Sequence, residues 1–138
     1  MNDTSVDRHL PCSGLLVYDV LGTLQLVTVP TACSLTVLNC TFTGNYGEIG
    51  GAVYAKDISS ITIQNSVFSN NSGNTYAGAV AVYFSSNFIR SYSSSYSINI
   101  VRNLFQLNAV KGFGSALALG YSRTSFRIEG NTFNGNFG

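Results

Sequence analysis

The segment FTGNYGEIGGAVYA, residues 42–55, places a phenylalanine, an asparagine three residues later and then a Gly-Gly-Ala-Val run. The same order returns in FSNNSGNTYAGAVAVY (68–83) and in FQLNAVKGFGSALALGY (105–121), and its first part returns in FNGNFG (133–138). The chain therefore repeats a fixed order of residues: a phenylalanine, an asparagine three residues later, and then two residues with little or no side chain. A repeat of about 20 to 50 residues built from short strands is typical of a solenoid.

Four phenylalanines anchor this repeat, and each is followed three residues later by an asparagine. The pairs are Phe42 and Asn45, Phe68 and Asn71, Phe105 and Asn108, and Phe133 and Asn136. Apolar residues stand seven and five residues before each anchor: Leu35 and Val37, Ile61 and Ile63, Ile98 and Ile100, and Phe126 and Ile128. Alternation with period two predicts a short strand with one buried face ahead of each anchor. A second strand is expected in GAVYA, GAVAVY and SALALGY, at or after the glycine positions Gly50, Gly51 and Gly78.

Short strands without helical periodicity predict an all-β solenoid, a coiled ribbon of parallel β-structure. We expect about four coils within residues 14–138, uncapped at their ends, and an irregular N-terminal segment at residues 1–13. Successive coils lie about 4.8 Å apart, so equal positions stack on each other. The phenylalanines then form an aromatic stack, and each asparagine passes amide hydrogen bonds from coil to coil at a turn, where it tolerates a left-handed backbone. The glycine pair permits a sharp corner where a Cβ would clash, so all these residues are interpreted as fold-determining.

The longest apolar stretch, LLVYDVLGTLQLVTV at residues 15–29, is interrupted by Asp19 and Gln25. It is too short to span a bilayer as a helix, so no membrane insertion is expected from this segment. Two strands with a turn at Gly22 fit it better. We interpret GLLVY, residues 14–18, as the second strand of an earlier coil. The first residues, MNDTSVDRHLPCSG, lack the basic start and apolar core of a signal peptide.

The composition excludes several classes of partner and cofactor. Charged residues make up only 9% of the chain and the net charge is +1, with no basic run that could neutralise phosphates, so we expect no nucleic-acid binding. The three cysteines, Cys12, Cys33 and Cys40, form no Cys-x-x-Cys pair, and His9 is the only histidine. No metal site or other cofactor is therefore expected. The cysteines are interpreted as small buried residues, with a disulfide between two of them as the alternative.

The tetrapeptides resemble those of the chlamydial polymorphic outer membrane protein repeat, whose paired FxxN and GGA[ILV] motifs build a right-handed parallel β-helix. Here FTGN, FSNN, FQLN and FNGN are intact, as is GGAV (50–53), whereas AGAV (77–80) and GSAL (114–117) are degenerate. The resemblance covers about residues 34–138. It implies a surface-exposed or secreted segment, outer membrane-associated in the bacterial family, that acts in adhesion.

Parallel β-helices also include polysaccharide lyases and glycosidases, which need clustered carboxylates on the outer faces of neighbouring coils. The six acids of this chain are Asp3, Asp7, Asp19, Glu48, Asp57 and Glu129. On the outer face of the first predicted strands, only the last coil is charged, with Arg127 and Glu129 as a solvated pair. We therefore expect no catalytic site. A fragment of a carbohydrate-active β-helix enzyme and a structural spacer remain the alternatives.

One insertion stands out between the second and third anchors. The anchors are 26, 37 and 28 residues apart, and the excess of the middle interval lies in SSNFIRSYSSSYS, residues 85–97. Serines give adaptable hydrogen bonding, Phe88, Tyr92 and Tyr96 offer large contact area, and Arg90 adds a planar donor. We interpret this loop as part of a recognition surface for a host or neighbouring-cell protein or glycan. The alternative is an insertion of the kind that solenoids tolerate on one face.

The ends of the predicted solenoid carry no recognisable polar cap. Uncapped coil ends present unpaired strand edges and apolar side chains. The sequence therefore predicts that the isolated chain is poorly soluble or associates end to end.

Overall fold

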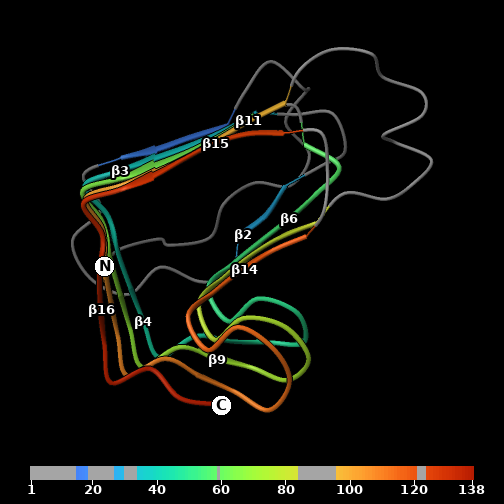
Figure 1. Ribbon diagram of the computed structural model, residues 1–138, viewed down its shortest axis with the longest axis vertical. Coiled ribbons are helices and arrows are strands. Elements are labelled where there is room, and N and C mark those ends of the chain that lie inside the picture. Colours follow the sequence, from blue (N-terminus) through green and yellow to red (C-terminus); the bar gives the residue numbers. More distant parts are fainter. Residues whose placement is uncertain (1–14, 19–26, 30–33, 59, 84–95, 121–123) are drawn as a thin grey trace, which may run out of the picture.

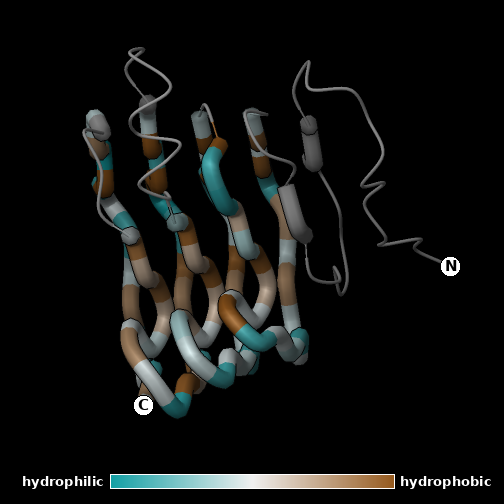
Figure 2. The backbone as a smooth tube through the Cα atoms, turned by 90° about the vertical axis from the view of Figure 1, so that its right-hand side faces the viewer, coloured by the Kyte–Doolittle hydropathy of each residue, from teal (hydrophilic) through white to brown (hydrophobic). Residues whose placement is uncertain are grey.

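The computed structural model describes residues 15–18, 27–29, 34–58, 60–83, 96–120 and 124–138. These residues form strands joined by turns, and all of their strand pairings are parallel (Figure 1). The predicted all-β, parallel solenoid is confirmed, with about four coils stacked side by side (Figure 2).

Each complete coil contains four strands. The first described set is β3 (Ser34–Leu38), β4 (Thr41–Thr43), β5 (Tyr46–Gly47) and β6 (Val53–Lys56). The next is β7 (Ser60–Gln64), β8 (Val67–Ser69), β9 (Ser72–Gly73) and β10 (Val80–Tyr83). A third is β11 (Tyr96–Val101), β12 (Leu104–Gln106), β13 (Ala109–Val110) and β14 (Leu117–Leu119), and β15 (Thr124–Glu129) and β16 (Thr132–Asn134) follow.

Equivalent strands of successive coils form four sheets, which we number by their order within a coil. The first sheet is β1-β3-β7-β11-β15, the second β4-β8-β12-β16, the third β5-β9-β13 and the fourth β2-β6-β10-β14. The register places Phe42 opposite Phe68, Phe68 opposite Phe105, and Phe105 opposite Phe133. The alignment of the sequence repeat on its phenylalanines is therefore the register of the sheets.

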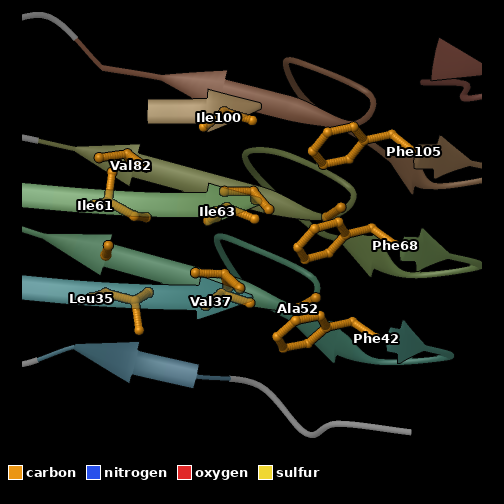
Figure 3. Packing of buried hydrophobic residues seen from close by; sticks show 14 of the residues in the cluster. Leu35, Val37, Phe42, Ala52, Ile61, Ile63, Phe68, Val82, Ile100 and Phe105 are labelled. Carbon is orange, nitrogen blue, oxygen red and sulfur yellow. The ribbon is translucent and has the colours of Figure 1, made fainter. Parts of the chain in front are cut away.

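The core lies between the first, second and fourth sheets (Figure 3). The phenylalanine rings stack nearly parallel, with centroids 4.7, 4.9 and 5.0 Å apart and interplanar angles of 7°, 9° and 6°. Beside them, the inward residues of the first sheet, such as Leu35 and Ile61, are fully buried. The stack predicted from the sequence is thus present, and it ends at Phe133, whose side chain is half exposed.

The predicted asparagine ladder is also present. Asn71 donates from its side-chain amide to Oδ1 of Asn108 and to the carbonyl oxygen of Phe42, both at 3.0 Å. Asn108 binds Asn136 in the same way, and Asn45 binds Asn71. The ladder therefore ties each coil to the next through side chains as well as through the sheets.

The expectation that these asparagines take the left-handed backbone is wrong. Positive φ occurs instead at the residue just before each of them, with 69° at Gly44, 54° at Asn70, 55° at Leu107 and 61° at Gly135. The preceding residue turns the chain, which leaves the ladder asparagine free to direct its amide into the interior.

A second polar ladder, which the sequence analysis missed, runs between the first and second sheets. The backbone N–H of Cys40 donates to the hydroxyl of Ser66, that of Ser66 to Oδ1 of Asn103, and that of Asn103 to Oδ1 of Asn131. Cys40 is buried, in agreement with a packing role, whereas Cys12 and Cys33 lie outside the described residues. The second ladder uses three residue types, so it is less visible as a sequence repeat.

The glycine corner has the predicted steric cause. A Cβ added to Gly51 would overlap the carbonyl oxygen of Gly78 in the next coil, and one added to Gly78 would overlap that of Ser115. A Cβ on Gly50 would overlap the carbonyl oxygen of Val53. Backbones of neighbouring coils therefore approach closely at this corner, as the repeat suggests.

Residues 15–29 contain two strands, as expected, β1 (Leu15–Tyr18) and β2 (Val27–Val29). The interpretation of GLLVY as a second strand is wrong, because β1 pairs with β3 in the first sheet and β2 pairs with β6 in the fourth. Both strand positions have the same apolar alternation, so the pattern alone does not tell them apart. The proposed turn at Gly22 and the segment 1–13 lie outside the described residues.

Candidate functional site

The predicted recognition loop falls largely outside the described part of the chain. Phe88, Arg90 and Tyr92 are not among the described residues. Tyr96 is the first residue of β11, so the last two residues of the predicted insertion belong to a strand. The described chain stops before this segment at Tyr83, the last residue of β10.

A groove of about 630 Å³ lies next to that point, on the outer face of the fourth sheet. Its other side is formed by the lobes, which we define as the turns at residues 48–52, 74–79 and 111–116 that join the third sheet to the fourth. Figure 1 shows the lobes at the lower right beside β6 and β14, and Figure 2 views the molecule from that side. The groove follows the solenoid axis, because the residues that line it come from successive coils.

Small residues in two outward rows create the floor of the groove. In the first row Tyr54 lies opposite Ala81, and Ala81 lies opposite Ala118. Beside it, Tyr83 neighbours Gly120, at which an added Cβ would be 2.9 Å from the Tyr83 ring. A large side chain is therefore followed by small ones along the coils, which leaves space between aromatic rings.

The lobes supply an apolar wall. Ile49, Tyr76 and Phe113 occupy this wall in three successive coils and line the groove. Tyr76 and Phe113 are bridged through their backbones, and their rings stack with centroids 6.0 Å apart at 29°. The side chain of Tyr76 is 46% exposed and that of Phe113 is 71% exposed. Two rings that stack on each other are thus partly exposed to solvent along the groove.

The groove is lined by uncharged side chains. Its polar side-chain groups are the hydroxyls of Tyr54, Tyr76 and Tyr83. Burial raises the pKa of Tyr54 above its ordinary value, and nearby Asp57 and Tyr83 raise it further. The hydroxyl of Tyr54, like that of any neutral tyrosine, can donate a hydrogen bond. Lys56 lies beside Tyr83 in the sheet and is exposed.

The carboxylates of the described residues lie apart from one another. Glu48 accepts hydrogen bonds from Asn74 and Thr75 of the next coil, and these bonds lower its pKa. Glu129 pairs with Arg127 at 2.9 Å on the surface, as the sequence predicts. Asp57 is buried at the end of β6. Within the described ranges, no three His, Cys, Asp or Glu residues gather in a metal-binding group.

Comparison of the chain with protein-family models, with curated proteins and with solved structures finds no match. In the part of the chain that the structure describes, no helix is long and apolar enough to cross a membrane.

Sequence reasoning did not identify the groove. The alternation in GAVYA, GAVAVY and SALALGY already makes Tyr54, Ala81 and Ala118 outward residues, which is a usable signal. The position of Tyr76 and Phe113 beside them depends on how the lobes fold back, and no repeat in the sequence encodes that.

Proposed function

We propose that this chain is a non-catalytic binding segment of a surface-exposed or secreted β-helix protein that acts in adhesion. The observation that carries the proposal is the aromatic groove on the outer face of the fourth sheet. Exposed aromatic clusters beside a rigid scaffold are typical of recognition surfaces. We take the groove, and not the insertion, as the first candidate for the binding surface, because the described residues define the lining of the groove.

We further propose that the coils belong with the chlamydial-type polymorphic outer membrane protein repeat. The support is that each motif position has a structural role here. The FxxN residues Phe68 and Asn71 form the aromatic stack and the amide ladder. Gly51 and Gly78 of the GGA[ILV] motif occupy the corner where coils touch. The family implies a cell-surface, outer membrane-associated or secreted location.

Binding is favoured over catalysis by the placement of the acids. Hydrolysis or elimination on a polysaccharide needs two carboxylates, or a carboxylate and a base, within reach of one bond. In the described coils Glu48, Asp57 and Glu129 are held separately by their neighbours or by burial. The groove itself offers only tyrosine hydroxyls as titratable groups. Its chemistry fits retention of a ligand.

The test is adhesion of cells to beads that carry the full chain. Cultured epithelial cells and a panel of microbial cells are counted on beads with the unaltered chain, Phe113→Ala or Tyr46→Ala. Tyr46 is a matched control, because its ring is also exposed but does not line the groove. We expect Phe113→Ala alone to reduce adhesion. Beads that retain no cells of any kind would refute the proposed function.

The role of the insertion is tested on the same beads. If the loop contributes to the binding surface, Tyr92→Ala combined with Tyr96→Ala reduces adhesion although Phe113 is intact. Unchanged adhesion would show that the insertion does not contribute to binding and is one of the insertions that solenoids tolerate on one face. Antibody labelling of intact source cells tests the surface location directly.

A further inference from the structure

The groove has the chemistry of a carbohydrate site, and we propose that it binds a neutral oligosaccharide through the faces of its sugar rings. This inference rests on the proposed binding function and names its ligand. The aromatic rings available to such a ligand are those of Tyr54, Tyr76, Tyr83 and Phe113. Their faces carry negative partial charge, which attracts the C–H groups on the face of a pyranose.

The shape of the groove fits a chain of sugars. Its volume of about 630 Å³ falls within the range of about 300–1,000 Å³ that is usual for ligand clefts. Ala81, which is buried, and Ala118 lie at the bottom of the groove, and the stacked pair of Tyr76 and Phe113 forms one side. Because the groove follows the solenoid axis across several coils, an extended oligosaccharide can lie along it.

The polar groups match a ligand that carries hydroxyls and no charge. The lining is uncharged, so a charged ligand would find no partner at the floor. Tyrosine hydroxyls both donate and accept hydrogen bonds, as sugar hydroxyls do. Tyr54, Tyr76 and Tyr83 line the groove with such hydroxyls. The remaining sugar hydroxyls point out of the open groove into water, where they keep their hydration.

A peptide fits this groove less well. The backbone groups of β10 are used by pairing with β6 on one side and β14 on the other. The hydrogen bond from Gly120 N–H to the carbonyl oxygen of Val82 continues this pairing beyond β14. An extended peptide lying across these strands therefore finds no backbone partner at the floor for its amide groups. A sugar has no backbone ladder to satisfy.

The experiment titrates the full chain with cellohexaose, chitohexaose, laminarihexaose, xylohexaose and mannohexaose. Saturation-transfer NMR reports which sugar protons contact the protein, and calorimetry gives Kd. We expect at least one of these probes to bind, with transfer concentrated on ring C–H protons. Tyr76→Ala and Phe113→Ala should each weaken binding about three- to tenfold, as expected for one lost ring contact. Tyr46→Ala should leave Kd unchanged.

A second variant fills the groove without removing a ring. Ala118→Leu places a larger side chain on the outer floor and should abolish binding while the circular dichroism spectrum is retained. The inference is overturned if none of the five probes binds, or if Tyr76→Ala, Phe113→Ala and Ala118→Leu all leave Kd unchanged.

Periodate treatment of cells separates this inference from the proposed function. If cells adhere through the groove and lose adhesion after their glycans are oxidised, both stand. If periodate-treated cells still adhere to the unaltered chain but not to Phe113→Ala, the adhesion function stands and the ligand is a protein. In that case the carbohydrate inference is rejected.

Discussion

Oδ1 of Asn108 accepts two hydrogen bonds from Asn71, one from its backbone N–H at 3.1 Å and one from its side-chain amide at 3.0 Å. Both side chains are fully buried. A single carboxamide therefore satisfies two donors of the neighbouring coil, and its own amide then reaches the carbonyl oxygen of Phe68 at 2.9 Å. Stability of the solenoid depends on such side-chain links as well as on its sheets.

Removal of one asparagine from the ladder should lower the free energy of unfolding. Asn71→Ala deprives the backbone N–H of Asn45 and the carbonyl oxygen of Phe42 of their Asn71 partners. Each buried group left unsatisfied costs about 1–3 kcal/mol, so we expect a loss of about 3 kcal/mol or more in the free energy of unfolding. Urea denaturation measures it. Asn134→Ala, at an exposed position of β16, is the control and should stay within about 0.5 kcal/mol of the unaltered chain.

Substitution of two phenylalanines by alanine should lower the free energy of unfolding by very different amounts. Phe68 is fully buried between Phe42 and Phe105, so Phe68→Ala leaves a cavity and should cost about 3–5 kcal/mol. Phe113 is 71% exposed and loses only its stacking on Tyr76, so Phe113→Ala should cost no more than about 0.5–1.5 kcal/mol. Thermal and urea unfolding of both variants check this. Equal losses would show that the aromatic stack is not the centre of the core.

Substitution by alanine should cost more stability at Gly78 than at Gly44, because only Gly78 lies against the backbone of the next coil. A Cβ on Gly78 would lie 2.7 Å from the backbone nitrogen and oxygen of Ala109, so Gly78→Ala must separate two coils. We expect a loss of at least about 3 kcal/mol, at the upper end of ordinary point mutations. At Gly44 nothing lies within 4 Å, and only the positive φ of 69° opposes a side chain. Gly44→Ala should therefore cost about 1–2 kcal/mol. A Gly78→Ala variant as stable as Gly44→Ala would contradict the close approach of the coils.

Acid should weaken one contact between coils. Hydrogen bonds from Asn74 and Thr75 lower the pKa of Glu48 below its ordinary value of 4.5. A depressed pKa in the folded state gives stability that is present above the unfolded pKa and is lost as pH falls through the folded pKa. Glu48→Gln should therefore be less stable than the unaltered chain at pH 6, and the difference should vanish at strongly acid pH.

Unfolding experiments at several pH values measure this difference, and NMR titration of the Glu48 carboxyl gives its midpoint. A midpoint at or above 4.5, or a stability difference that does not change with pH, would contradict the assignment of these hydrogen bonds.

The fold was largely readable from the repeat, and the site was not. Phe42, Phe68 and Phe105 mark the register because the same ring must fill the same place in each coil. A structural feature whose residue type changes from coil to coil is not visible as a repeat in the sequence. The second ladder changes from Cys40 to Ser66 to Asn103, and the strand Leu15–Tyr18 shares its alternation with either strand position, so neither could be placed by pattern.

The sequence by itself determined the all-β solenoid, its period and the inward residues, because stacking of equal positions repeats an apolar residue at each inward position and the same phenylalanine and asparagine at the anchor positions. Only the tertiary structure decided that the lobes fold back beside the fourth sheet and set Tyr76 and Phe113 next to Ala81 and Ala118. Tyr76 and Phe113 stand only five residues before Ala81 and Ala118, but their side chains are exposed to solvent, where packing does not force a recurring residue. Their proximity follows from the turn geometry of each coil, which the fixed offsets of phenylalanine, asparagine and glycine do not specify.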